Sequence, residues 1–249
     1  MSLKSKVAIV TGGAGYIGST TARRLASEGA TVVVSDVNRE LAAEVADAIV
    51  AEGGSATAIE TDVTSTRSIE AMVAQTIEQH GRIDVLVNVA GGSARKQAST
   101  VHGSSEEVIR QVIEVNLLGA IFCARAVLGP MIEQGGGKIV NVASIVALQG
   151  SAGHADYAAA KAGVIAFSKT LAMEVASDNI NVNCVSPGLV PRPGTSVEHI
   201  PRTNYLGKIA TAETVSNVIA FLVSDEADFV VGQNYVVDGG RSLGLKGSR

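Results

Sequence analysis

Three side chains with acid/base chemistry stand close together in the second half of this 249-residue chain. Tyr157 and Lys161 are four residues apart, and Ser144 precedes Tyr157 by thirteen residues. Residues i and i+4 share one face of a helix, so the phenol and the ammonium are predicted to lie side by side. A neighbouring cation favours the phenolate and lowers a pKa that is otherwise about 10. The spacing therefore predicts a tyrosine that acts as a general acid/base near neutral pH.

A glycine-rich segment near the start of the chain has the spacing of a phosphate-binding loop. It reads Thr11-Gly12-Gly13-Ala14-Gly15-Tyr16-Ile17-Gly18 and lies between a strand pattern and a helical pattern. Such glycines allow a tight turn and a close approach of backbone to pyrophosphate, and the helix N-terminus offers free N–H groups to the anion. A glycine-rich turn without a ligand is the alternative to this predicted dinucleotide site.

Asp36 indicates which dinucleotide is bound. It ends the second strand pattern, eighteen residues after Gly18, where a carboxylate can accept hydrogen bonds from the adenosine ribose hydroxyls. The same charge would repel a 2′-phosphate, so NAD is predicted as the cofactor, and Arg39 nearby is the reason to keep NADP as the alternative. Asp62 is interpreted either as the N-cap of the next helix or as a contact of the adenine ring.

Short apolar runs alternate with longer helical patterns along the whole chain. The predicted strands are residues 7–10, 31–35, 56–60, 83–88, 138–142, 180–185 and 235–237. The predicted helices are residues 17–28, 39–52, 66–80, 105–131, 157–176 and 212–224. Continuous apolar strands alternating with helices predict an α/β fold, a Rossmann-type doubly wound parallel sheet of about seven strands with helices on both faces.

The chain is expected to form one domain, residues 1–249, with a single long irregular segment. That segment, residues 187–204, carries four prolines and is interpreted as a substrate loop or lid, with a passive surface loop as the alternative. Two helices, residues 108–131 and 157–176, are apolar around much of their circumference. Because a helix of that kind must be buried on more than one side, we expect a homotetramer, against the alternative of a thick monomeric core.

Composition argues against several classes of function. A net charge of -4 and a pI near 5.6 disfavour a nucleic-acid-binding surface. No apolar run approaches the roughly 18 residues of a spanning helix, and no signal-peptide pattern opens the chain, so a soluble cytoplasmic protein is expected. Cys123 and Cys184 lie in apolar segments and are interpreted as buried thiols. No metal site is predicted.

Five ordered motifs make the chain resemble the short-chain dehydrogenase/reductase family over essentially its whole length. Besides the glycine loop and Tyr157-x-x-x-Lys161, these are Asn88-Val89-Ala90-Gly91, Pro187-Gly188 and Val237-Asp238-Gly239-Gly240. The resemblance implies a catalytic tetrad of Asn116, Ser144, Tyr157 and Lys161, in which Asn116 bends the long helix and anchors a water that links Lys161 to solvent. It implies hydride transfer between NAD and a secondary alcohol or ketone, with Tyr157 as general acid/base.

The resemblance also implies a set of cofactor-binding residues along these motifs. They are Gly12, Gly15, Tyr16, Ile17, Gly18, Asp36, Val37, Asp62, Val63, Asn88, Ala90, Gly91, Tyr157, Lys161, Pro187, Gly188 and Val190. Two positions depart from the pattern of the roughly 250-residue branch of the family. Tyr16 stands where that branch usually has glycine, and Val89 replaces a second Asn. Neither departure removes a catalytic group.

The substrate is the least constrained part of the prediction. Ser144, Tyr157 and His154 are expected to contact it, together with Arg95 and Arg192. Basic side chains gather on segments expected to converge over the nicotinamide: Arg95, Lys96, His154, Arg192, His199 and Arg202. This group predicts an anionic substrate, and solvated surface cations are the alternative.

Two other functions stay open alongside the leading prediction. A 3-oxoacyl carrier-protein reductase is the first, although Asp36 favours NAD, and Gly129 and Met173 stand where such reductases present basic side chains to the carrier protein. A non-catalytic NAD-binding sensor is the second, although proteins of that kind typically lose the tyrosine or the lysine.

Overall fold

The computed structural model of the chain describes residues 2–93, 99–198 and 203–244. Its centre is one parallel sheet of seven strands in the order β3-β2-β1-β4-β5-β6-β7. The strands are β1 (Val7–Thr11), β2 (Thr31–Asp36), β3 (Ser55–Glu60), β4 (Val85–Asn88), β5 (Gly137–Val142), β6 (Ile180–Pro187) and β7 (Asn234–Val237). Every predicted strand is present, and the predicted doubly wound α/β fold is confirmed.

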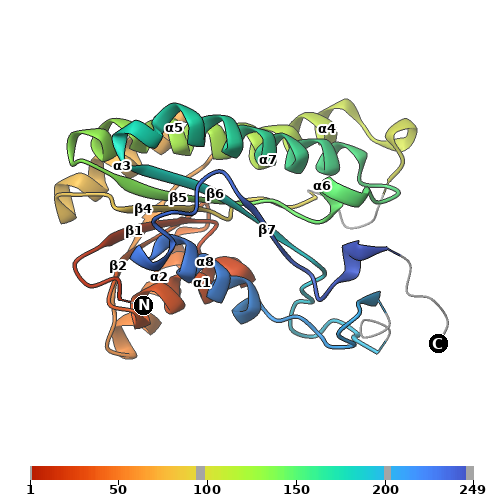
Figure 1. Cartoon of the computed structure of the whole chain (residues 1–249), viewed down its shortest axis with the longest axis horizontal. Coiled ribbons are helices and arrows are strands. Elements are labelled where there is room, and N and C mark those ends of the chain that lie inside the picture. The colour runs from red at the N-terminus through yellow and green to blue at the C-terminus, as the bar shows by residue number, and fades with distance from the viewer. Residues whose placement is uncertain (1, 94–98, 199–202, 245–249) are drawn as a thin grey trace.

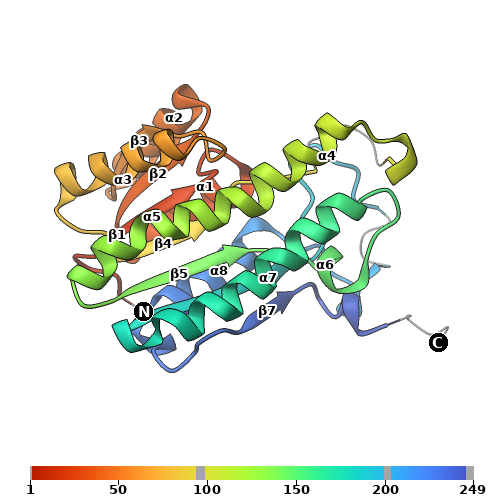
Figure 2. The same cartoon turned by 90° about the horizontal axis from the view of Figure 1, so that it is seen from above.

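Helices cover both faces of the sheet (Figures 1 and 2). One layer holds α1 (Tyr16–Ser27), α2 (Arg39–Ala51) and α8 (Ala212–Val223). The other holds α3 (Thr66–His80), α4 (Glu106–Ile113), α5 (Gly119–Glu133), α6 (Val146–Gln149) and α7 (Ala155–Val175). The short helix α6 was not predicted, because four residues are too few to show a helical period in the sequence.

The strands are apolar on both sides because each sheet face has its own core. In β1, Ala8 and Val10 pack with α1 residues such as Leu25, whereas Val7 and Ile9 pack with α3 and α5. Successive side chains of a strand point to opposite faces, so a strand between two helical layers must be apolar at every position. This explains why the apolar runs predicted the strands correctly.

The predicted helix 105–131 is a long helix interrupted by a π-helical turn. The turn spans Glu114–Leu118, between α4 and α5, and places Asn116 at its centre. The helical segment Glu106–Glu133 contains an 18-residue window with a mean hydropathy of 1.7, so by length and composition alone it could cross a membrane, contrary to the expectation that no apolar run approaches that length. Its buried side chains, including Cys123, Val127 and Met131, pack against the sheet as those of a core helix do.

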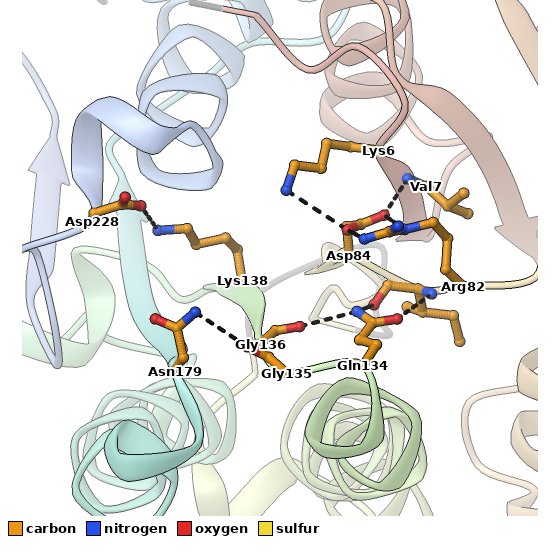
Figure 3. Close-up of polar contacts among 11 residues, drawn as sticks. Lys6, Val7, Arg82, Asp84, Gln134, Gly135, Gly136, Lys138, Asn179 and Asp228 are labelled. Atoms are coloured by element: carbon orange, nitrogen blue, oxygen red, sulfur yellow. Dashed lines mark hydrogen bonds and ion pairs between the residues drawn. The ribbon is translucent and has the colours of Figure 1, made fainter.

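The amino-terminal edge of the sheet is held together by paired polar groups (Figure 3). Asp84 is only 5% exposed; its Oδ2 accepts a hydrogen bond from the Val7 backbone N–H at 2.9 Å, and Arg82 binds it through two nitrogens at 2.8 and 2.6 Å. The hydrogen bond to Asp84 raises the pKa of the Arg82 guanidinium. Lys138 pairs with Asp228 on the other side of this edge. The loops at the opposite, carboxyl-terminal edge form the candidate site.

Candidate active site

A cleft of about 830 Å³ opens at the carboxyl ends of the strands, where ligands of doubly wound sheets bind. Its walls include most of the predicted site residues. These are Gly12, Gly15, Tyr16, Ile17, Gly18, Asp36, Val37, Asp62, Val63, Ala90, Gly91, Ser144, Tyr157, Lys161, Pro187, Gly188, Val190 and Arg192. Residues from four of the five sequence motifs, although distant along the chain, therefore meet at one cavity, whereas Val237, Asp238 and Gly239 line a separate pocket.

The glycine loop is built so tightly that side chains are excluded. A Cβ atom at Gly12, where φ is 64°, would lie 2.7 Å from the Ala90 backbone, and one at Gly18 would lie 2.0 Å from the Gly12 carbonyl oxygen. Helix α1 begins directly after Gly15, which provides no side-chain cap for the first turn. Free N–H groups at the start of a helix, beside glycines that leave room for a ligand, fit the pyrophosphate of a dinucleotide.

Asp36 and Asp62 stand at the end of the cleft expected to hold adenosine. Asp36 Oδ2 accepts a hydrogen bond from Ala14 N–H at 3.0 Å and Oδ1 accepts one from Asn38 N–H at 3.1 Å, so the carboxylate is fixed at the mouth of the loop. Asp62 Oδ1 accepts from the Thr64 N–H and hydroxyl. The interpretation of Asp62 as a helix N-cap is wrong, because Ser65 caps α3.

Ser144 and Tyr157 meet inside the cleft, from β5 and α7 respectively. The Ser144 side chain is 7% exposed and follows the end of β5, while Tyr157 lies in the first turn of α7. Burial raises the pKa of the Tyr157 phenol, and a hydrogen bond from Ser144 opposes that rise. The expectation of a lowered pKa is therefore not met in the free protein, because removal of the phenol from water outweighs its partners.

Lys161 is a buried ammonium one helical turn after Tyr157. Its residue is 4% exposed, and Nζ donates a hydrogen bond to the Val142 carbonyl at 2.8 Å. Nζ lies 5.8 Å from the centroid of the Tyr157 ring, so the two side chains share one helix face as predicted. Burial lowers the pKa of Lys161 to about 8, and a neighbouring thiol, Cys184, partly opposes that change.

Asn116 lies behind the cleft and fixes its wall. Its Oδ1 accepts a hydrogen bond from Gly92 N–H at 2.9 Å, and its Nδ2 donates to the carbonyls of Gly92 and Val112 at 2.8 and 2.9 Å. The bond to Val112 links the side chain to its own helix beside the π-helical turn. A Cβ at Gly91 would lie 2.4 Å from Asn116 Oδ1 and 3.1 Å from Lys161 Nζ, which explains the glycine.

The predicted basic side chains are only partly brought to the cleft. Arg192 lines it, as expected. His154 instead precedes α7 in a turn, with Nδ1 3.4 Å from Ser151 Oγ, and it is not among the described residues that line the cleft. Arg95, Lys96, His199 and Arg202 lie outside the described residues. Asn88, predicted to bind the cofactor, is not among the described residues that line the cleft, and its Nδ2 donates instead to Asn141 Oδ1 at 2.8 Å within the sheet.

Several lining residues were not singled out from the sequence. They are Thr61, Thr64, Gln111, Glu114, Val115, Val142 and Ala143. Most adjoin a recognised motif and could have been found as its neighbours. Gln111 near the end of α4 and Glu114 at the start of the π-helical turn adjoin no glycine or tyrosine motif, and their approach to the cleft depends on how this helix packs beside the sheet.

Comparison with known proteins agrees with this architecture. The profile of the family described as Enoyl-(Acyl carrier protein) reductase matches residues 12–242. The chain is 39% identical to a 3-oxoacyl-[acyl-carrier-protein] reductase of Thermotoga maritima, covering 96% of this chain and 99% of the relative. It is 40% identical to a cis-4-hydroxycyclohexanecarboxylate dehydrogenase of Sinomonas cyclohexanicum, covering 94% and 96%.

A solved short-chain dehydrogenase/reductase from Burkholderia xenovorans superimposes with a TM-score of 0.91 at 36% identity, covering 98% of this chain and 99% of that one. The chain belongs to the short-chain dehydrogenase/reductase family and is an oxidoreductase of that class.

The burial of Lys161 has a consequence for stability that can be measured. Its folded-state pKa, about 8, lies below the ordinary lysine value of 10.5 that applies in the unfolded chain. The unfolded chain therefore binds this proton more tightly, so the penalty is complete below pH 8 and disappears as pH rises toward 10.5. We expect Lys161→Met to raise the free energy of unfolding near pH 7. Removal of the buried charge should contribute on the order of 3 kcal/mol, and the Val142 carbonyl, which loses its hydrogen bond, should take back part of that gain. Urea denaturation of both proteins across pH 7 to 10.5 should show this difference shrinking; a constant difference would contradict it.

Proposed function

We propose that the protein is an NAD-dependent dehydrogenase or ketoreductase acting on a secondary alcohol or its ketone. The observation that supports this most directly is the meeting of Ser144, Tyr157 and Lys161 in the cleft that also holds the glycine loop. A bound nicotinamide would exchange a hydride with the carbinol carbon of the substrate. The residues around it supply alignment and move the proton.

The chain's own groups divide this task. During oxidation Tyr157 takes the alcohol proton, and during reduction it returns that proton to the carbonyl oxygen. The Ser144 hydroxyl donates a hydrogen bond to the same oxygen and stabilises the charge that develops there. Lys161 binds the nicotinamide ribose and presents a positive charge beside Tyr157, which favours the phenolate. Asn116 holds the backbone of Gly92, and with it the wall behind Lys161.

Activity should depend on the Tyr157 hydroxyl. Tyr157→Phe removes one oxygen and should lower kcat/KM, because proton transfer and positioning are lost together. The decrease should correspond to a loss of several kcal/mol of transition-state stabilisation. Ser144→Ala should lose less, about 10²–10³-fold. Steady-state rates with a panel of hydroxy acids and NAD, read as NADH absorbance, measure both. Tyr235→Phe, on β7, is the matched control, and ordinary turnover by folded Tyr157→Phe would disprove the assignment.

The cofactor should be NAD because of Asp36. The carboxylate, held by Ala14 and Asn38, can accept hydrogen bonds from two ribose hydroxyls but would meet a 2′-phosphate with like charge. Asp36→Ala should narrow or invert the preference in calorimetric titrations with NAD and NADP. Asp47→Ala, an exposed carboxylate on α2, removes the same charge away from the cleft and should leave the preference unchanged. Tighter binding of NADP by the unaltered protein would refute the assignment.

A 3-oxoacyl carrier-protein reductase is the second candidate, favoured by the likeness to the Thermotoga maritima enzyme. Two surface positions weigh against it in this chain. Gly129 is exposed, and Met173 is 82% exposed, where a carrier protein would require basic side chains. Reduction of a 3-oxoacyl thioester with NADPH, faster than oxidation of any hydroxy acid with NAD, would favour this candidate. The retained Tyr157 and Lys161 argue against a non-catalytic NAD-binding sensor.

An anionic substrate is proposed from Arg192. This exposed arginine lines the cleft a few residues after Gly188, on the open side where substrate must enter. Guanidinium groups bind carboxylates through two parallel hydrogen bonds. Arg192→Ala should therefore raise KM about tenfold or more for a hydroxy acid and much less for its methyl ester. Arg23→Ala on α1 is the control, and equal effects of Arg192→Ala on acid and ester would contradict the proposal.

We propose a homotetramer, and a cytoplasmic location as expected from the sequence. Among the exposed large apolar side chains of the described residues, Ile132 and Met173 lie near the ends of α5 and α7, and Phe229, Val231 and Val236 lie around the edge strand β7. Two separate apolar surfaces are what a tetramer with two kinds of interface requires. Light scattering at micromolar concentration should give about four times the chain mass of 25.4 kDa; a mass near 25.4 kDa would refute this.

A further inference from the structure

A row of buried polar residues crosses the centre of the sheet beneath the cleft. Thr11 on β1, Asn88 on β4, Asn141 on β5 and Cys184 on β6 are in-register partners on four neighbouring strands. Each is at most 5% exposed. Because they share one register, their side chains point to the same face of the sheet, toward α5 and α7. Polar groups at that depth are costly unless they are hydrogen-bonded to one another.

The row forms one continuous chain of hydrogen bonds with a single direction. Ala90 N–H donates to Thr11 Oγ1 at 3.4 Å, and the Thr11 hydroxyl donates to Asn88 Oδ1 at 3.4 Å. Asn88 Nδ2 donates to Asn141 Oδ1 at 2.8 Å, and Asn141 Nδ2 donates to Ser168 Oγ at 2.9 Å.

The last member of the chain lies on the catalytic helix. The Ser168 hydroxyl donates to the Val164 carbonyl at 2.7 Å, within α7. Both asparagines use the oxygen as acceptor on one side and the nitrogen as donor on the other, so each amide has one permitted orientation. Hydrogen bonds in such a head-to-tail series polarise and strengthen one another.

The two ends of this chain are the two halves of the proposed active site. It begins at Ala90, which lines the cofactor cleft, and it ends at Val164, one turn after Lys161. Lys161 and Ser168 are two turns apart and lie on one face of α7, and the Cys184 thiol interacts with both of them. Neither Asn141 nor Ser168 is among the described residues that line the cleft.

A buried ammonium needs such a support. Lys161 Nζ donates a hydrogen bond to the carbonyl of Val142, the residue after Asn141, and no carboxylate among the described residues pairs with it. Hydration would favour a small outward movement of α7 that returns the ammonium to water. The bond from Asn141 to Ser168 ties α7 to β5 beside the Val142 carbonyl.

We propose that the hydrogen-bond chain Thr11–Asn88–Asn141–Ser168 holds Lys161 in its working position, with Asn141 and Ser168 as positioning residues. The inference rests on the proposed role of Lys161 in binding the nicotinamide ribose. It does not depend on which substrate or which dinucleotide is used.

The test is a double-mutant cycle on cofactor affinity. The probe is whichever of NADH and NADPH binds the unaltered protein more tightly, titrated by calorimetry. Ser168→Ala and Asn141→Ala should each weaken binding roughly tenfold, and Ser168→Thr, which keeps the hydroxyl, should restore it. In a Lys161→Ala background, Ser168→Ala should have no further effect, because the group that it positions is already absent.

Asn183→Ala is the matched control. Asn183 is also a buried asparagine, 1% exposed on β6, but its side chain bonds Val230 O and Gln233 N–H outside the chain of hydrogen bonds. It should destabilise the fold and leave the affinity unchanged. If Lys161→Ala weakens binding, an unchanged affinity in Ser168→Ala would overturn the proposal. So would an equal loss in the presence and absence of Lys161, since both show that Ser168 does not act through Lys161.

A second measurement separates this inference from the proposed function. The contribution of Lys161 to pH-dependent stability is measured as the difference in unfolding free energy between a protein and the same protein carrying Lys161→Met. Tyr157 and Cys184, the titratable groups that face the ammonium, are present in both proteins, so their titration is common to the two. If Ser168→Ala releases Lys161 toward water, this difference should lose most of its dependence on pH between 8 and 10.5. A retained dependence would overturn the inference. Lys161→Ala with unchanged affinity would contradict only the proposed role of Lys161, and the pH-dependent stability would then decide the inference.

Discussion

The burial of the Lys161 ammonium is the constraint around which the carboxyl end of the sheet is arranged. A positive charge at 4% exposure requires a fixed acceptor, and the Val142 carbonyl provides it at the end of β5. It also requires space, which explains why Gly91 has no side chain between Lys161 and Asn116. The cost is a lowered pKa of about 8. The free-energy penalty of burying a charged group is commonly tolerated at active sites, where the group must be held in a state that water would not favour.

The two edges of the sheet treat charge in opposite ways. At the amino-terminal edge Asp84 is surrounded by Arg82, Lys6 and the Val7 N–H, so each charge has a nearby partner and stabilises the fold (Figure 3). At the carboxyl-terminal edge Lys161 has a carbonyl and a thiol as neighbours, and the Tyr157 phenol is raised in pKa by burial. Complete pairing suits a structural edge, whereas incomplete pairing leaves groups able to exchange protons with a ligand.

Much of this arrangement could be predicted from the sequence because it follows from local patterns. Continuous apolar runs identified the strands, and the spacing of Tyr157 and Lys161 correctly placed both on one face of a helix. The π-helical turn around Asn116 could not be predicted in detail, since it depends on packing against the sheet. The pKa of Tyr157 was predicted with the wrong sign, because the sequence shows the neighbouring cation and does not show how deeply the phenol is buried.

The buried polar row illustrates what a sequence cannot reveal even when each residue is visible. Asn88, Asn141 and Ser168 are isolated polar letters within apolar segments, and each alone would be interpreted as a local hydrogen-bonding residue. Their relation appears only when the strand register aligns Asn88 with Asn141 and α7 brings Ser168 beside them. Register is a property of the assembled sheet, determined by its pairing and packing together.

The contrast between a buried framework and an exposed rim offers an explanation of how proteins similar to this one can act on different substrates. The frame that holds Lys161 consists of strands and the buried face of α7, where a change of one side chain disturbs several others. Residues on the open side of the cleft, such as Gln111, Leu189 and Arg192, are exposed and lie at helix surfaces or in the segment after β6. The names of two relatives, a 3-oxoacyl-[acyl-carrier-protein] reductase and a cis-4-hydroxycyclohexanecarboxylate dehydrogenase, show that chains similar to this one act on different substrates. Specificity in this chain should accordingly be sought in the rim residues rather than in the strands and the buried face of α7.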